Sequence, residues 1–150
     1  MSKTMNMLNV LAVVCIMLNG CEHRMEKDFF RKPLGNRLER LRQYCLENQY
    51  KIFRYGNDVV EPPLTDLANP IAERGAESVP FLLNRLDSES DDISARDILL
   101  IFEKMTYFKS YDVKSDMALM SKLTSRVSVM KDKGWQSTCR RKIQNIKDSG

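Results

Sequence analysis

Apolar residues recur at steps of three and four along most of this 150-residue sequence, and that spacing is the strongest constraint on its fold. One stripe is Ile98, Ile101, Phe102 and Met105, and another is Met117, Met120, Leu123, Val127 and Met130. Such steps place side chains on one face of an α-helix, whereas strands need alternation in steps of two, which is nowhere sustained. The sequence therefore predicts an all-α fold, with five or six helices in a single small domain.

Turn and capping residues set the expected helix boundaries. The expected helices span about 34–50, 65–75, 78–86, 93–108, 117–130 and 135–146. The Pro62-Pro63 pair marks a loop after the first helix, because proline interrupts helices. Asp91 and Asp92 stand at the start of the fourth helix, where negative charge meets the positive end of the helix dipole. Lys133-Gly134 is expected to end the fifth helix.

The first twenty residues have the pattern of a secretory signal peptide. Lys3 supplies a basic start, Val10–Leu18 is an apolar run without a charge, and the small residue Gly20 precedes Cys21. A membrane-spanning helix needs about 20 residues, so this run is too short to cross a membrane. The order of basic start, short apolar run and small residue predicts that residues 1–20 are removed.

Leu18-Asn19-Gly20-Cys21 resembles a lipobox, the recognition site of bacterial lipoprotein signal peptidase. Leu18, Gly20 and Cys21 match the pattern, and Asn19 occupies its tolerant position. The resemblance implies cleavage before Cys21, a diacylglyceryl group on the cysteine sulfur and a further acyl chain on the new amino terminus. Two or more acyl chains anchor a protein stably. Glu22 follows in place of an aspartate, which by the same resemblance favours the periplasmic face of the outer membrane over the inner membrane.

The stretch after Cys21 is charged, has no clean period and ends at Pro33. It is expected to be a tether, with the helical domain at 34–150 beyond it. His23, the single histidine of the chain, lies in this tether. A lone histidine cannot build a Ser-His-Asp triad or a zinc site, because both need partners at fixed distances. We therefore expect His23 to be solvated.

Cys45 and Cys139 are the cysteines that remain once Cys15 is removed and Cys21 is acylated. Cys45 continues a stripe of leucines, and Cys139 lies on a second stripe: Leu34, Leu38, Leu41; Trp135, Ile143, Ile146. Both cysteines are therefore expected to face inward. In an oxidising compartment two such residues predict a disulfide, which would stabilise the domain by roughly 4–5 kcal/mol before strain. Two buried free thiols are the alternative.

The segment at about 64–106 resembles a HEAT-type helical repeat. The shared features are a glycine, a proline-started helix with a leucine-rich face and an acidic link: Gly75, Pro80, Leu82, Leu83, Leu86, Asp91, Asp92 and Arg96. No second copy recurs at a period of about 30 to 45 residues. The sequence thus predicts one repeat-like helical pair inside a small helical domain.

No motif of a known catalytic or metal site is present in the sequence. The acidic link DSESDD lacks the alternating ligands, central glycine and closing glutamate of an EF-hand. A glycine-rich phosphate loop and a Gly-x-Ser-x-Gly turn are also missing. We expect a protein that is not an enzyme, with no metal, no small-molecule substrate and no cofactor beyond the lipid on Cys21.

Two basic clusters and a methionine stripe are the remaining candidates for binding. The clusters are Arg37, Arg40 and Arg42 in the first expected helix and Arg140, Arg141 and Lys142 in the last. If the two helices lie together, one face would favour anionic lipid or an acidic partner; a solvated surface is the alternative. The methionines Met117, Met120 and Met130 are candidates for an adaptable groove, and core packing is the alternative.

Three classes of function follow from these observations. The first is an adaptor that binds another envelope protein, as the small helical pilotin lipoproteins do. The second is an immunity lipoprotein that neutralises a periplasmic toxin, and the third is an enzyme with an unrecognised site. Nucleic acid is not an expected partner for an exported, lipid-anchored chain. A protein-binding adaptor is the primary prediction.

Overall fold

The computed structural model describes residues 23–33 and 35–149. The chain is 75% helical, with eight α-helices and no strand among the described residues. The predicted all-α fold is therefore confirmed, with more helices than the five or six expected. Residues from Asn36 onward form one compact unit, and the segment that ends at Gly35 forms another.

The segment expected to be a tether contains a helix, α2, at Arg24–Arg31. The absence of a clean apolar period gave no reason to expect this helix, but Arg, Glu, Lys and Met all favour helix with or without such a period. His23 precedes the helix with a φ of 64°, and its Nδ1 lies 3.4 Å from Oε1 of Glu26. The rings of Phe29 and Phe30 meet edge to face, with centroids 5.3 Å apart.

The first expected helix of the domain is two helices. They are α3 at Arg37–Arg42 and α4 at Leu46–Val59. Gln49 explains the break, because its Nε2 donates to the carbonyl oxygens of Leu41 and Tyr44 at 3.1 and 3.0 Å. Carbonyls at the end of a helix have no partner within the helix. The buried amide of Gln49 thus stabilises the end of α3 and fixes the turn before α4.

The middle of the chain follows the expected boundaries closely. Its elements are the 3₁₀ turn η1 (Thr65–Ala68), α5 (Asn69–Glu73), the 3₁₀ turn η2 (Gly75–Glu77), α6 (Val79–Ser88) and α7 (Asp92–Phe108). The predicted stripe of α7, Ile98 to Met105, is fully buried. Asp91 caps α7 as expected, since its carboxylate accepts from the backbone N–H of Ser94 at 2.7 Å. Although burial alone would raise the pKa of Asp91, the hydrogen bonds from Ser94 hold it below its usual value.

The last two helices are α8 at Met117–Ser128 and α9 at Lys133–Asp148. Lys133-Gly134 begins α9 and does not end α8, because Asp132 caps α9 by accepting from the N–H of Trp135 at 2.9 Å. Met120 and Met130 are buried, which confirms core packing for them, whereas Met117 is 75% exposed.

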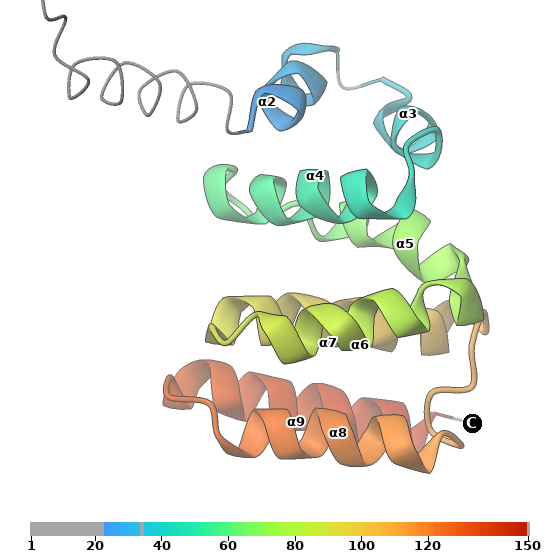
Figure 1. Ribbon diagram of the computed structural model, residues 1–150, viewed down its shortest axis with the longest axis vertical. Coiled ribbons are helices and arrows are strands. Elements are labelled where there is room, and N and C mark those ends of the chain that lie inside the picture. The colour runs from blue at the N-terminus through green and yellow to red at the C-terminus, as the bar shows by residue number, and fades with distance from the viewer. Residues whose placement is uncertain (1–22, 34, 150) are drawn as a thin grey trace, which may run out of the picture. The chain divides into compact units, whose positions relative to one another are not determined.

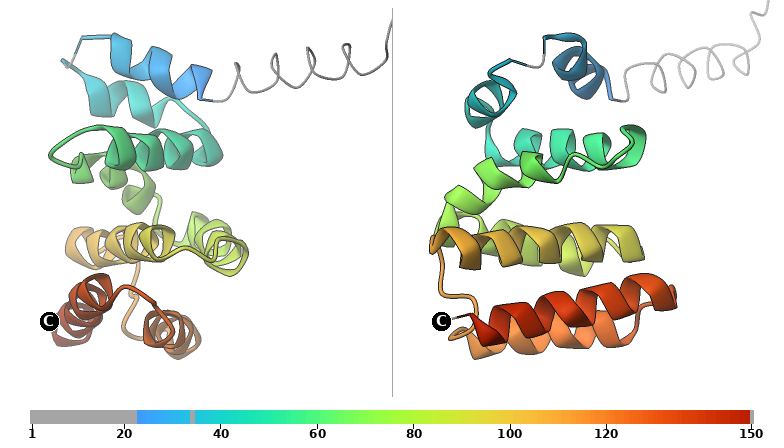
Figure 2. Two further views of the ribbon diagram at one scale, coloured as in Figure 1. Left: turned by 90° about the vertical axis from the view of Figure 1, so that its left-hand side faces the viewer. Right: turned by 180° about the vertical axis from the view of Figure 1, so that it is seen from behind.

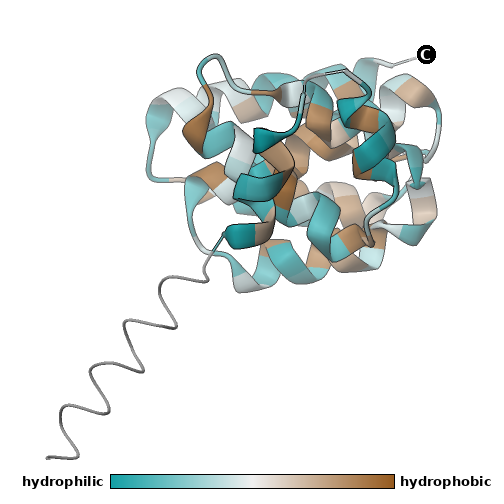
Figure 3. Ribbon diagram, turned by 90° about the horizontal axis from the view of Figure 1, so that it is seen from above, coloured by the Kyte–Doolittle hydropathy of each residue, from teal (hydrophilic) through white to brown (hydrophobic). Residues whose placement is uncertain are grey.

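From Asn36 onward, the helices form successive layers (Figure 1). α4 lies with η1 and α5, α6 lies beside α7, and α8 lies beside α9. α7 is central, because it packs against α5 in the layer before it and α9 in the layer after it. Figure 2 shows α8 and α9 side by side in the last layer. Apolar residues concentrate where the helices meet (Figure 3).

Gly75 allows the corner between α5 and α6 to touch the link between α7 and α8. Its φ is 54°, and a Cβ at this position would lie 2.2 Å from the carbonyl oxygen of Ser110. The hydroxyl of Ser110 donates to the carbonyl of Ala72 at 2.6 Å across the same contact. Two segments far apart in sequence therefore lie so close that their backbones touch. Only glycine permits this at position 75, because any side chain would clash.

We expect Gly75→Ala to lower the free energy of unfolding by about 2–4 kcal/mol, from the left-handed backbone and the clash with Ser110 together. Urea denaturation followed by circular dichroism measures this change. Gly35→Ala is the matched control, because a Cβ there meets nothing within 4 Å, and its effect should stay within about 0.5 kcal/mol. Equal effects of the two substitutions would contradict the role given to the Gly75 contact.

Candidate functional site

A buried carboxylate, Asp97 of α7, lies beneath the surface that we identify as the candidate site. Its side chain is 1% exposed and is contacted by two guanidinium groups. Oδ2 accepts from Arg54 of α4 at 3.1 Å, and Oδ1 accepts from Nε of Arg96 at 2.8 Å. Asn57 of α4 donates to Oδ1 at 3.2 Å. One carboxylate thus joins two layers of the domain.

Burial and the neighbouring charges shift the pKa of Asp97 in opposite directions. Burial raises the pKa of its carboxyl above the usual value, and the nearby charges of Arg96 and Arg54 oppose that rise. A buried charge that loses its partners is costly. The arrangement is therefore stable only while both arginines keep their positions. By accepting from both guanidinium groups, Asp97 positions the two arginines.

Arg96 connects the buried carboxylate of Asp97 to the surface, where it contacts Trp135, the single tryptophan of the chain. The Arg96 guanidinium lies 4.5 Å from the centroid of the Trp135 ring, a cation–π arrangement. Trp135 is 37% exposed, and the neighbouring apolar side chains Ile93 and Val129 are 38% and 67% exposed. Ile93, Arg96, Val129 and Trp135 are called the Trp135 surface below.

Polar contacts fix the backbone under the Trp135 surface. Asp92, in the first turn of α7, accepts from the N–H groups of Lys131 and Asp132 at 2.7 and 2.8 Å. Arg126 of α8 donates to the carbonyls of Ser90 and Asp91 at 2.6 and 2.9 Å. The link between α8 and α9 is thereby held against the start of α7, so the segments that carry Ile93, Val129 and Trp135 meet at one corner of the domain.

An open groove of about 460 Å³ adjoins this surface. Its lining is mixed in charge and includes Val129 and Asp92. The remaining lining residues are Leu86, Asp87, Glu89, Ser90, Arg126 and Lys131. The groove therefore extends the Trp135 surface toward α6.

A second exposed aromatic pair lies at the other end of α7. Tyr107 is 82% exposed and meets Phe108 edge to face, with ring centroids 5.4 Å apart. Two smaller cavities of about 260 and 210 Å³ lie nearby, and both are lined by Thr106 and Ser149. Across residues 23–33 and 35–149, no hydrogen bond or ion pair reaches the Tyr107 side chain, whereas Arg96 lies over the Trp135 ring. The Trp135 surface is therefore the better candidate for specific binding.

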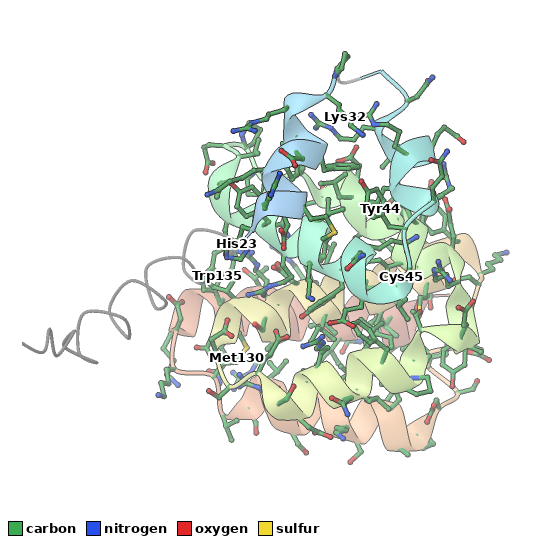
Figure 4. All side chains as sticks on the ribbon, turned by 45° about the horizontal axis from the view of Figure 1, so that its top comes forward. His23, Lys32, Tyr44, Cys45, Met130 and Trp135 are labelled. Carbon is green, nitrogen blue, oxygen red and sulfur yellow. The ribbon has the colours of Figure 1, made fainter. Side chains whose placement is uncertain are left out.

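The residues of the predicted anchor, Leu18, Gly20 and Cys21, lie outside the described residues. The predicted disulfide is not formed, because Cys45 and Cys139 are both free thiols. Cys45 is exposed at the start of α4 and does not face inward, since α3 ends before it. Cys139 faces inward as expected, and burial raises the pKa of its thiol to about 11. In Figure 4, Cys45 and Trp135, one turn before Cys139, appear on opposite sides of the view.

Within the part of the chain that the structure describes, His, Cys, Asp and Glu side chains form no group of three that could hold a metal ion. Across residues 23–33 and 35–149, none of the helices combines the length and apolar character that crossing a membrane requires.

Sequence reasoning missed Asp97 and its link to Trp135. A signal was present, because Asp97 directly precedes Ile98 and lies four residues before Ile101, on the apolar side of a helix. A carboxylate at such a position must find a partner when the helix packs. Its partner Arg54 is 43 residues away in the chain, so the pattern indicates that a partner exists without identifying it.

We expect Asp97→Ala to lower the free energy of unfolding by about 3–5 kcal/mol, because it leaves Arg54 and Arg96 without their buried counter-charge. Urea denaturation measures the loss, and the fluorescence of Trp135 should shift as Arg96 leaves its ring. Glu39→Ala also removes a carboxylate from an arginine, but the Glu39 side chain is 72% exposed. This control should change stability by about 0.5 kcal/mol or less. A loss no larger for Asp97→Ala would rule out the proposed structural role.

Comparisons with known proteins return no significant match to a family model, a curated protein or a solved structure. The candidate site is accordingly defined by its own geometry. It consists of the exposed Trp135, Arg96 over its ring, and the exposed apolar residues Ile93 and Val129. The buried carboxylate of Asp97 holds Arg96 in place.

Proposed function

We propose that this chain is a lipoprotein of the bacterial cell envelope, anchored through Cys21, whose helical domain binds another protein as an adaptor. The Trp135 surface is the contact for that partner. Protein binding is proposed because Trp135 is exposed and Arg96 lies over its ring. Anchoring through lipid is proposed because Leu18-Asn19-Gly20-Cys21 resembles a lipobox.

The composition of the Trp135 surface supports protein binding. Tryptophan and arginine are enriched among the few residues that supply most of the binding energy in protein interfaces. Apolar neighbours such as Ile93 and Val129 help to exclude water around them. Arg96 is already fixed by Asp97, so less side-chain freedom is lost when a partner binds.

The layered arrangement supports an adaptor in a second way. Each layer after α3 is a helical pair, and α5, α7 and α9 pack in succession. Helical-repeat proteins stack pairs in this manner and use extended surfaces to bind other proteins. We infer that the repeat-like segment at 64–106 is one unit of such a short array, and that neighbouring units have lost the sequence pattern.

The anchor is tested by Cys21→Ser. The wild-type chain, expressed in a bacterial host with radioactive palmitate, should incorporate label and migrate as the processed form, because the Cys21 sulfur is the nucleophile for lipid transfer. Cys21→Ser should remove the label and leave the full-length precursor. Cys15→Ser is the matched control and should behave as wild type. Label that persists in Cys21→Ser would overturn the anchor.

The binding surface is tested by photo-crosslinking in intact cells. A photoreactive amino acid in place of Val129 should give an adduct with one defined envelope protein, identified by mass spectrometry. The same probe in place of Tyr107, equally accessible but at the other end of α7, is the control and should not give it. Trp135→Ala should remove the adduct while the circular dichroism spectrum is unchanged, since truncation of a central residue costs about 2 kcal/mol or more of binding energy.

Three outcomes of the crosslinking would contradict the adaptor proposal. One is an adduct from position 107 and none from position 129. Another is an adduct from position 129 that Trp135→Ala leaves intact. The third is an adduct with a secreted toxin, which would assign the chain to the immunity class.

A further inference from the structure

The positive charge of the domain is concentrated in its last layer. Residues 111–150 contain nine Lys and Arg against four Asp, whereas residues 36–110 contain ten Lys and Arg against thirteen Asp and Glu. The mild excess of the whole chain, +4, hides this separation. A concentrated charge of one sign creates a local field that attracts partners of the opposite sign.

Exposed basic residues of α9 lie along one line. Lys133, Arg140 and Lys147 follow each other at intervals of seven residues, which is two helical turns, and all three are exposed. The line is roughly 21 Å long from the rise of a helix. Arg141 is exposed on the adjoining side of α9. We call these four residues the α9 basic face.

The α9 basic face is not neutralised within the domain. Among the residues that the structure describes, Arg140, Arg141 and Lys147 form no ion pair, in contrast to Lys142, which contacts Glu103 of α7. The exposed residues of the neighbouring helix α8 are mostly small: Ala118, Ser121, Thr124, Ser125 and Ser128. α8 and α9 form the last layer of the unit that begins at Asn36, and no other helix of that unit lies on their outer side (Figure 2).

The composition of this face distinguishes between two kinds of anionic partner. Protein interfaces have an apolar and aromatic centre, whereas the exposed residues in line with the basic positions, Ser137 and Gln144, are polar. The aromatic residue of α9, Trp135, is four residues before the buried Cys139 and lies toward α7. A helix face with about four to eight Lys and Arg and no apolar centre is typical of proteins that bind anionic lipid headgroups.

We propose that the α9 basic face binds the surface of an anionic phospholipid bilayer through electrostatic attraction. This contact is separate from the Trp135 surface and from acylation of Cys21, so it does not depend on the proposed function. It would hold the outer side of the last layer against the headgroups.

The test is vesicle co-sedimentation of the full chain carrying Cys21→Ser, which excludes acylation. Vesicles of phosphatidylcholine with phosphatidylglycerol should bind the chain, and raised NaCl should release it, since salt screens surface charge. Vesicles of phosphatidylcholine alone measure any contribution of the apolar run at residues 10–18. The combined substitution Lys133→Gln, Arg140→Gln and Lys147→Gln should lower the partition coefficient roughly a hundredfold, from about fivefold for each charge.

A matched triple variant distinguishes the effect of where the positive charges lie from the effect of the net charge. Arg31→Gln, Lys51→Gln and Lys109→Gln together remove three exposed positive charges outside α9, and should leave most of the binding intact. Equal losses in the two triple variants would overturn the proposal, as would equal binding to both kinds of vesicle. Binding to polyglutamate but not to anionic vesicles, lost in the α9 variant, would assign the face to an acidic protein and also overturn it.

Discussion

The buried carboxylate of Asp97 is the contact on which the order of this domain most depends. α7 is the central helix, and Asp97 connects it to α4 through Arg54 and, by way of Arg96, to Trp135 of α9. Cys45 and Cys139 are free, so no disulfide between them joins these layers. A charge in the interior is tolerated only where partners reach it. We infer that Asp97 selects the one arrangement of α4 on α7 in which both guanidinium groups meet its oxygens.

The same contact connects the interior to the surface proposed for binding. Arg96 uses its donors on Asp97, and its guanidinium carbon lies over the Trp135 ring. A surface arginine without such support would sample many rotamers, and ordering it would cost part of the binding energy. Fold stability and the proposed recognition of a partner would therefore share one residue, and substitutions at Asp97 should affect both.

Features set by local sequence could be predicted, and features set by distant residues could not. The stripe from Ile98 to Met105 and the cap at Asp91 depend on residues within two helical turns, and both predictions are confirmed. The leucine stripe ending at Cys45 suggested one helix, but Gln49 ends α3 through hydrogen bonds that only the folded chain can form. The disulfide prediction failed with it, because the inward orientation of Cys45 rested on that helix. Lipid attachment to Cys21, which lies outside the described residues, remains a prediction from the lipobox resemblance.

Charge shows most clearly why position in the fold decides the role of a residue. The sequence contains two similar basic clusters, in α3 and α9, which would share a face if a disulfide brought their helices together. α3 packs on α5 and η1, whereas α9 packs on α7 and α8, so the clusters belong to different layers. Arg42 of α3 forms two hydrogen bonds of 2.8 Å with Glu73, while Arg140 and Arg141 extend from the last layer. Glu73 thus takes Arg42 into a contact within the domain, whereas Arg140 and Arg141 of α9 keep charge that an external surface can use.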